Sequence, residues 1–268
     1  MRMTALPTNS LPVEAAKRVA EYVLWGRVAA QGRLEKALVP TFERPQPASV
    51  PPTAVLSTRA QVDASVEEAH RLRLPLHPTR EKNWDALGAV AAVLAYVGPG
   101  ARVLDAGAAR YSIILPWLRL YGVESLLGLN IEFDDRQVRH GSATFRHGDI
   151  TATGLPDASL DAVTCMSVIE HGVDVPAFLA EASRVLRPGG VLVISTDYDQ
   201  SPPDTSRQEA YGQPVHIFGP EGIERLVKHA EELGFSLVGD LALSHDERPV
   251  HWHRHGLDYT FLLLTFTR

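Results

Sequence analysis

A carboxylate and a glycine stand at a sharp turn near the middle of the chain. The segment 103–110 begins as an apolar strand and passes through Asp105, Ala106 and Gly107 into a helical pattern over 111–121. A strand that turns directly into a helix leaves backbone N–H groups and a side-chain carboxylate at one edge of a sheet. In open α/β sheets, nucleotide-like ligands bind at that edge. This turn is therefore the first candidate binding site.

Three histidines near the C-terminus are spaced by two. On an extended strand, His251, His253 and His255 would share one face, as metal ligands can. Alternatively, they form a polar loop that lines the mouth of a substrate site, with Trp252 as one wall. No further acidic or sulfur ligand follows at a tight spacing, so we expect no metal ion and assign His251, Trp252 and His253 to substrate binding.

The elements that position these residues alternate between strand and helix. Nearly continuous apolar strands indicate a parallel sheet covered on both faces. The last two strands have no helix between them and should pair antiparallel. Strands are expected at 102–106, 125–131, 143–147, 160–168, 191–196, 235–243 and 258–266, and helices at 83–97, 111–121, 134–140, 174–186 and 220–233. The expected fold class is α/β, with five parallel strands and a terminal antiparallel pair.

The first 80 residues do not follow this alternation. Helical periodicity covers 13–38 and 59–73, and the segment 40–52 between them contains five prolines. We therefore expect two domains, which are a helical N-terminal arm or lid at 1–80 and a ligand-binding domain at 81–268. The arm either covers a site or forms a homodimer through its helices.

Several motifs resemble those of class I S-adenosylmethionine (SAM)-dependent methyltransferases. Asp105 and Gly107 match the start of the family's Asp-x-Gly-x-Gly-x-Gly motif, although Ala109 and Tyr111 replace the later glycines. The Gly148-Asp149 pair, the Leu155-Pro156 pair, the run 159–163 and the turn 186–190 match further family motifs. The resemblance covers about 82–268. It implies a seven-stranded Rossmann-like sheet, SAM as cofactor and methyl transfer as the reaction.

The resemblance also implies which residues hold SAM. Asn130 stands where the family carries an acidic residue that binds the ribose hydroxyls, and Glu132 can reach in instead. Asp149 would accept a hydrogen bond from the adenine amino group. Trp84 either folds over the methionine end of SAM or anchors the core. The expected cofactor residues are Trp84, Asp105, Ala106, Gly107, Asn130, Ile131, Glu132, Asp149, Ile150, Ser167 and Val168.

Methyl transfer requires alignment of the acceptor, the methyl carbon and the leaving sulfur. A hydroxyl acceptor also gains from a base, and histidine suits neutral pH. His171 and His216 are the candidate bases, although each could instead be structural. Some branches of the family hold a metal with a glutamate at the position of Ser167, so the serine argues against a metal there. Glu170, Asp197 and Tyr198 follow the fourth and fifth strands and are expected to line the acceptor site.

The composition restricts the partners. The 268 residues carry a net charge of −6, which argues against a nucleic-acid partner. The single cysteine, Cys165, fits a reducing compartment. Neither a signal pattern nor an apolar run of about 18 residues occurs, so we expect no membrane partner and a cytoplasmic location.

The function expected from the sequence is SAM-dependent methylation of a small molecule, on an oxygen of a natural product or sugar-like acceptor. Three alternatives remain open. A degenerate SAM-binding module without catalysis is compatible with the altered glycines and Asn130. A nucleic-acid methyltransferase is disfavoured by the acidic balance. An NAD(P)-dependent oxidoreductase is disfavoured because the turn lacks the glycines that admit a pyrophosphate.

Overall fold

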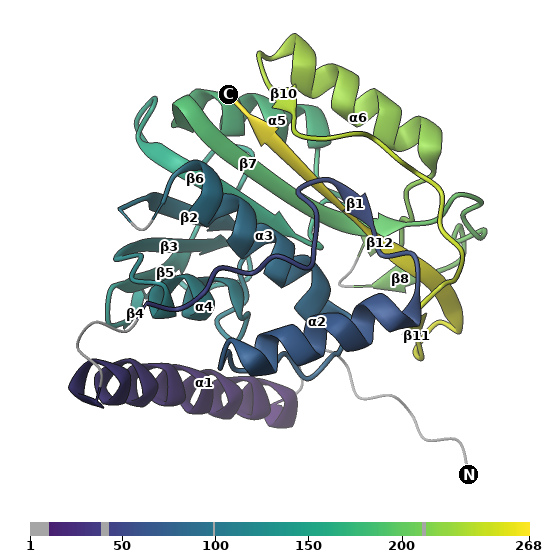
Figure 1. Cartoon of the computed structure of the whole chain (residues 1–268). Helices are drawn as coiled ribbons and strands as arrows, with labels where there is room; N and C mark the ends of the chain where they lie inside the picture. The colour runs from purple at the N-terminus through teal and green to yellow at the C-terminus, as the bar shows by residue number, and fades with distance from the viewer. Residues whose placement is uncertain (1–10, 39–42, 99, 211–212) are drawn as a thin grey trace.

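A single large sheet runs through the molecule (Figure 1). The computed structural model describes residues 11–38, 43–98, 100–210 and 213–268, so residues 39–42 of the expected linker lie outside the described part. The main path of strands is β1-β12-β7-β6-β2-β3-β5-β4. Its five parallel strands are β2 (Arg102–Ala106), β3 (Ser125–Asn130), β5 (Ala143–His147), β6 (Leu160–Met166) and β7 (Leu186–Tyr198). The predicted Rossmann-like α/β sheet is confirmed.

The last long strand, β12 (Leu257–Thr267), pairs antiparallel with β7 along most of its length, whereas the expected antiparallel pairing with the strand at 235–243 is short. Its predicted partner strand at 235–243 is much shorter, because Gly239 has a φ of +84° and turns the chain away from the sheet. Only β10 (Ser236–Leu237) pairs with β12 there. Two further short strands also pair with β12, namely β1 (Ala54–Val55) and β11 (Val250–Trp252). Part of the N-terminal arm is therefore built into the sheet.

Helices cover both faces of the sheet. The first face carries α3 (Lys82–Tyr96) and α4 (Ile114–Leu120), and the second carries α5 (Val175–Val185) and α6 (Pro220–Glu232). Successive residues of a strand point to opposite faces. Accordingly, Val103 of β2 packs in the core under α3 and α4, whereas its neighbour Leu104 packs in the core under α5 and α6.

One expected helix is absent from the described residues. Where 134–140 was expected to be helical, the short strand β4 (Val138–His140) pairs antiparallel with β5. The segment before it, Asp134 to Gln137, has no apolar residue and so gives a helix nothing to bury. Pairing with the edge of β5 instead satisfies the backbone groups of β4 and places Val138 opposite Phe145.

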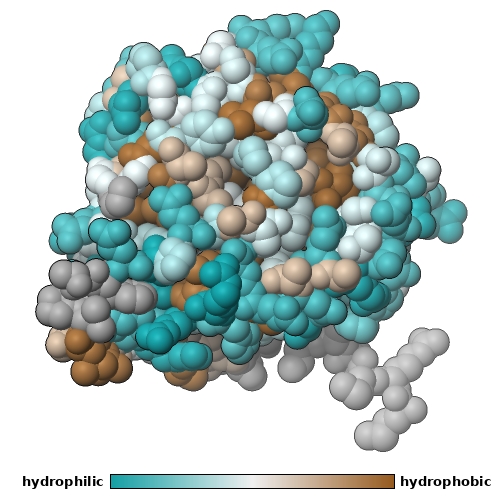
Figure 2. All heavy atoms as spheres, viewed as in Figure 1, coloured by the Kyte–Doolittle hydropathy of each residue, from teal (hydrophilic) through white to brown (hydrophobic). Residues whose placement is uncertain are grey.

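The N-terminal arm packs on the first face of the sheet. Its helices are α1 (Leu11–Leu38) and α2 (Arg59–Arg71), and Thr58 and Gln61 form a capping box at the start of α2. Trp25 of α1 is 4% exposed and belongs to the same core as α3 and α4. Hydrophobic atoms remain at the surface near the lower left end of α1 (Figure 2). None of the helices in the described ranges is long and apolar enough to span a membrane.

Candidate active site

The turn after β2 can be formed only around a glycine. Gly107 has a φ of +81°, in the left-handed region that side chains disfavour. A Cβ atom at this position would lie 2.5 Å and 2.6 Å from the two methyl carbons of Val168, in the turn after β6. The N–H groups of Gly107 and Ala108 both donate to the carbonyl of Leu129, at 2.8 Å and 3.0 Å. The turns at the carboxyl ends of β2, β3 and β6 are therefore in direct contact.

Asn130 holds this turn through its side chain. Its amide nitrogen donates to the carbonyls of Gly107 and Ala108, at 3.2 Å and 3.1 Å, and its amide oxygen accepts from the backbone N–H of Glu132 at 2.8 Å. A carboxylate could not make the first two bonds, because it has no donor. These two bonds explain why residue 130 is an asparagine, although the methyltransferases that the sequence resembles usually carry an acidic residue at this position. The exposed carboxylate of Glu132 is left as the acidic group at the end of β3.

Asp149 lies exposed after β5, the next strand along the sheet. One oxygen of its carboxylate accepts from the backbone N–H and the hydroxyl of Thr151, at 2.8 Å and 2.7 Å. These bonds fix the orientation of the carboxylate and leave its other oxygen for an external donor such as an amino group. The next residue, Ile150, is 7% exposed and packs in the core.

Asp105 is buried at the end of β2, with 2% exposure. The hydroxyl of Thr164 donates to its carboxylate at 2.8 Å. Burial raises the pKa of Asp105 to about 7, although the hydrogen bond from Thr164 opposes that shift. The group is therefore partly protonated near neutral pH.

This shift makes the effect of an Asp105→Asn substitution depend on pH. Because the folded pKa lies above the unfolded value of 3.8, the folded state retains a proton that the unfolded state has lost, and this stabilising contribution disappears as the pH rises through about 7. The neutral amide has no such dependence. We expect the variant to gain stability relative to the wild type between pH 5 and pH 8, by up to about 2.7 kcal/mol, which corresponds to about two pH units between pH 5 and the folded pKa. Urea unfolding of both proteins at the two pH values measures this, and a difference that is the same at both pH values contradicts the assignment.

Lys82 and Asp85, in the first turn of α3, were not expected at the site. The ammonium group of Lys82 donates to the hydroxyl of Ser167, lies 3.3 Å from the Asp85 carboxylate and stands 3.8 Å from the centroid of the Phe261 ring. The hydroxyl of Ser195 donates to Asp85 at 2.8 Å. Together these contacts hold Ser167 in its left-handed conformation, with a φ of +53°, and so fix the start of the turn 167–171.

Two buried carboxyl groups lie here, one within this turn and the other near the end of β7. Glu170 is 1% exposed and Asp197 is 5% exposed. The hydroxyl of Thr196 donates to one carboxylate oxygen of Glu170 at 3.2 Å, and the other has no hydrogen-bond partner among the residues described. Burial raises the pKa of both groups, and their mutual repulsion adds to the rise for Glu170.

His171 lies beside these groups and is half-buried. Burial and the nearby Lys82 lower its pKa to about 4. The imidazole is therefore neutral at physiological pH, which is the protonation state that a general base needs, and it is a weaker base than an ordinary histidine.

Two expected site residues belong to the core instead. Trp84 is 2% exposed and packs among the apolar residues under α3, so its ring presents no face to a ligand. Tyr198 is fully buried, and its hydroxyl donates to the carbonyl of Leu243 at 2.6 Å, so its phenol is engaged within the protein rather than exposed at the carboxyl edge. In both cases a large aromatic residue was chosen for its position in the chain, and its burial could not be read from that position.

The histidines after β7 lie at the carboxyl edge but not in one row. The exposed His216 packs edge-on against Phe218 at 4.4 Å. In the β11–β12 hairpin, His251 bonds the Asp258 carboxylate at 2.7 Å and lies 4.4 Å from the ring of His253. His255 lies in the tight turn, where its N–H donates to the carbonyl of Trp252. The shared strand face needed for a metal row does not form, and no group of three potential metal ligands occurs in the described residues.

The N-terminal arm contacts the turn 105–110 directly. The indole N–H of Trp25 donates to the carbonyl of Arg110 at 3.1 Å, and the ring stacks on His140 with 5.2 Å between centroids. His140 in turn bonds the carboxylate of Glu21 at 2.6 Å. The helix α1 therefore supports the far end of the turn 105–110 through one hydrogen bond.

Replacing Trp25 by phenylalanine removes that donor and keeps most of the packing. We expect the Trp25→Phe variant to lose about 1–2 kcal/mol of stability, because a largely buried carbonyl loses its partner. Its affinity for S-adenosylhomocysteine should fall several-fold, because Arg110 becomes free to shift. Calorimetric titration and urea unfolding measure the two effects. Tyr22→Phe is the matched control, since Tyr22 is 70% exposed on the same helix. Unchanged affinity in Trp25→Phe contradicts the link between α1 and the turn.

The parallel sheet and the ligand turn at its carboxyl edge define a Rossmann-like nucleotide-binding domain. Residues 104–194 match a family model described as a methyltransferase domain. A probable S-adenosylmethionine-dependent methyltransferase of Mycolicibacterium smegmatis is 42% identical over 73 residues, which are 25% of this chain and 28% of that protein. The sterol 24-C-methyltransferase of Yarrowia lipolytica is 30% identical over 179 residues, 59% of this chain and 45% of that protein. The segment 104–194 therefore resembles the methyltransferase domain of SAM-dependent methyltransferases, enzymes whose cofactor is SAM.

Solved structures support the fold over a longer part of the chain. The Burkholderia thailandensis 1,6-didemethyltoxoflavin-N1-methyltransferase, crystallised with 1,6-didemethyltoxoflavin and S-adenosylhomocysteine, aligns with 81% of this chain and 96% of its own, at 17% identity and a TM-score of 0.50. By contrast, the chain spans less than half the length of the two curated relatives described above.

Proposed function

We propose that the protein transfers the methyl group of SAM to a small-molecule acceptor at the carboxyl edge of the sheet. The observation that carries the proposal is the turn 105–110, which Asn130 clamps and which packs against Val168 of the neighbouring turn. The exposed carboxylates of Glu132 and Asp149 flank this turn on the next two strands. They would bind the ribose hydroxyls and the adenine amino group of SAM.

The acceptor group is proposed to be a hydroxyl of a natural product or sugar-like compound. When bound, SAM supplies an electrophilic methyl carbon on a sulfonium. The protein's own contribution is to align the acceptor oxygen with that carbon and to remove the hydroxyl proton. His171 is the proposed base, because its pKa is lowered to about 4 and its ring is neutral at the working pH. The polar groups of Glu132 and Asp149 stay with the cofactor and take no part in the proton transfer.

A binding measurement tests the cofactor, and a mass measurement tests the reaction. SAM at about 100 times its dissociation constant should stabilise the protein by about 2.7 kcal/mol, whereas NADPH should give no shift. A screen of hydroxyl, amine and thiol compounds should then find products heavier by one methyl group among the hydroxyl compounds. Absence of a thermal shift with millimolar SAM contradicts the proposal. Binding without any methylated product favours a SAM-binding module without catalysis, to which the altered glycine motif also points.

The remaining partner assignments are also proposals. The net charge of −6 supports a small molecule over a nucleic acid as acceptor. The one thiol, Cys165, is buried and needs no oxidising compartment, which supports a cytoplasmic location.

A homodimer through α1 is proposed on its exposed apolar residues. Val19, Tyr22 and Val23 are 62%, 70% and 55% exposed on one side of the N-terminal half of this helix. Light scattering should therefore give twice the chain mass of 29.3 kDa for the wild type. The Val23→Glu variant should give the mass of one chain. Tyr96→Glu, at an exposed residue of α3, is the matched control and should stay dimeric. A monomeric wild type contradicts the dimer.

A further inference from the structure

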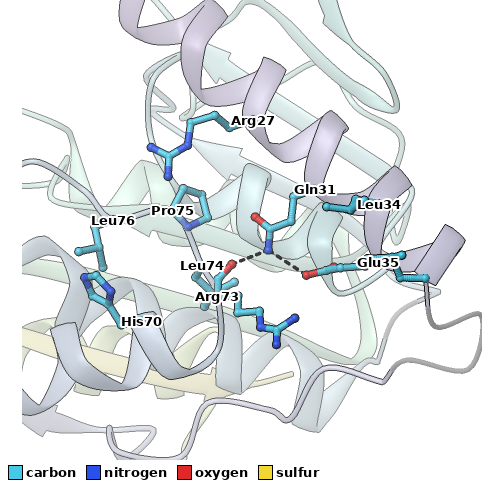
Figure 3. A pocket seen from close by; sticks show the side chains of 10 residues that line it. Arg27, Gln31, Leu34, Glu35, His70, Arg73, Leu74, Pro75 and Leu76 are labelled. Carbon is cyan, nitrogen blue, oxygen red and sulfur yellow. Dashed lines mark hydrogen bonds between the residues drawn. The ribbon is translucent and has the colours of Figure 1, made fainter.

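A cavity lies between α1 and the segment that connects α2 to α3 (Figure 3). Its volume is about 570 Å³, which falls in the range of small-molecule sites. The C-terminal half of α1 forms one wall, and residues 70–76 form the other. None of the residues assigned above to SAM or to the acceptor lines it.

The polar lining is positively charged. The side chains of Arg27 and Arg73 line the cavity, and neither forms an ion pair within the described part of the chain. Glu35 is the one carboxylate in the lining, and both of its oxygens are already engaged. Gln31 donates to the first at 3.0 Å, and Arg44 donates to the second at 2.6 Å. Two guanidinium charges therefore face the cavity without a counter-charge, in a protein whose net charge is −6.

The cavity wall is held in place by a specific contact. Arg73 has a φ of +54°, in the left-handed region that a residue with a side chain rarely adopts. The amide of Gln31 donates to the carbonyl of Arg73 at 2.5 Å, as the dashed line in Figure 3 shows. Figure 3 also shows the side chain of Arg27 reaching from α1 toward Pro75. The bond from Gln31 thus fixes the backbone of Arg73 at the wall of the cavity.

Apart from His70, the rest of the lining is apolar. Leu74 is 5% exposed and Pro75 is buried, so both are supported by the core beneath them. The carbonyl of Pro75 accepts the indole N–H of Trp117 at 2.8 Å, which anchors this floor to α4. Leu34 and Leu38 of α1 are 58% and 71% exposed at the rim. An apolar floor beside two unpaired guanidinium groups matches a ligand with an anionic head and an apolar body.

We propose that this cavity is a binding site for an amphipathic anion, with a carboxylate or phosphate head held by Arg27 and Arg73 and an apolar chain lying against Leu34 and the half-buried Leu76, above the floor formed by Leu74 and Pro75. The guanidinium groups supply charge-assisted hydrogen bonds to the head group. The apolar chain gains by leaving water. The site is separate from the proposed methyl transfer and does not depend on it.

Calorimetric titration with octyl phosphate, octanoate and octyltrimethylammonium tests this proposal on the full chain. The two anions should bind with one site per chain, and the cation should not bind. The Arg27→Gln/Arg73→Gln variant should bind the anions at least ~10-fold more weakly. Arg33→Gln is the control and should bind the anions as tightly as the wild type does, because Arg33 is exposed on the same helix outside the cavity. The affinity for S-adenosylhomocysteine should be equal in all three proteins, so failure here leaves the methyltransferase proposal intact.

Three outcomes overturn the proposal. The first is the absence of saturable binding of either anion to the wild type. The second is equal anion binding by the Arg27→Gln/Arg73→Gln variant, provided that its circular dichroism and unfolding match those of the wild type. The third is binding of the cation as tightly as the anions, which would show that the apolar chain alone determines binding.

Discussion

The His171→Ala variant is expected to lose methyl transfer by a factor of about 100 or more in kcat, once an acceptor is known. The physical reason is that the half-buried imidazole is neutral at pH 7 and is the proposed group that removes the acceptor proton. Its affinity for S-adenosylhomocysteine should stay within about twofold of the wild type, because the cofactor is assigned to the turns after β2, β3 and β5 and, in the turn after β6, to Ser167 and Val168 rather than to His171. Steady-state kinetics and calorimetry measure the two quantities.

His229→Ala is the matched control, since His229 lies on α6, on the opposite face of the sheet from α3, and pairs with Glu232. It should retain wild-type kcat. His216→Ala distinguishes the two candidate bases, because a large loss there together with full activity in His171→Ala would assign the role to His216. Wild-type turnover in both variants would mean that neither histidine is the base.

The same assignment fixes the pH dependence of the wild-type enzyme. An ordinary histidine would become protonated as the pH falls below 6.5 and would stop acting as a base. Because burial and Lys82 lower the pKa of His171 to about 4, the base should remain available to about pH 5. A fall in kcat with a midpoint near 6.5 would contradict the assignment.

The Gly107→Ala variant is expected to lose cofactor binding by at least about tenfold. A side chain at a φ of +81° costs about 1–2 kcal/mol in backbone strain alone. The new methyl group would also lie 2.5 Å from Val168, so the turns after β2 and β6 must separate. Because SAM is proposed to bind on these turns, the distortion should appear in the affinity as well as in the stability.

Two variants separate these causes. Gly234→Ala, at a φ of +89° with nothing within 4 Å of the added carbon, should lose stability through strain alone and keep its cofactor affinity. Val168→Ala introduced together with Gly107→Ala removes the two closest contacts, leaves only the Cβ of residue 168 at 3.1 Å, and should recover part of the affinity. Calorimetric titration with S-adenosylhomocysteine measures the cofactor affinity of the Gly107→Ala, Gly234→Ala and double variants. Wild-type affinity in Gly107→Ala would show that SAM does not depend on this turn.

The sequence predicted the sheet well because its signals are local. Apolar strands alternating with amphipathic helices and a left-handed glycine after α3 were enough to find the five parallel strands and most of the helices. The wrong helix at 134–140 and the shortened strand at 235–243 both lie at edges of the sheet. There, pairing with a distant strand or the conformation of one glycine decides the outcome, and neither is visible in periodicity.

The site was harder to predict because its contacts join distant segments. Asn130 appeared to be a weakened ribose ligand, whereas its amide clamps the turn at Gly107. Lys82 and Asp85 were missed, although a carboxylate inside the apolar helix 83–97 was a usable signal of a buried polar network. Trp84 and Tyr198 were assigned to ligands from their position alone, and only their burial corrects this.

A crystal structure of the protein with S-adenosylhomocysteine tests the central claim most directly. It should place the adenine amino group within hydrogen-bond distance of Asp149 and the ribose hydroxyls within reach of Glu132, with the homocysteine end over Gly107. A ligand bound elsewhere on the molecule, for example in the cavity beside Arg27 and Arg73, would contradict the account.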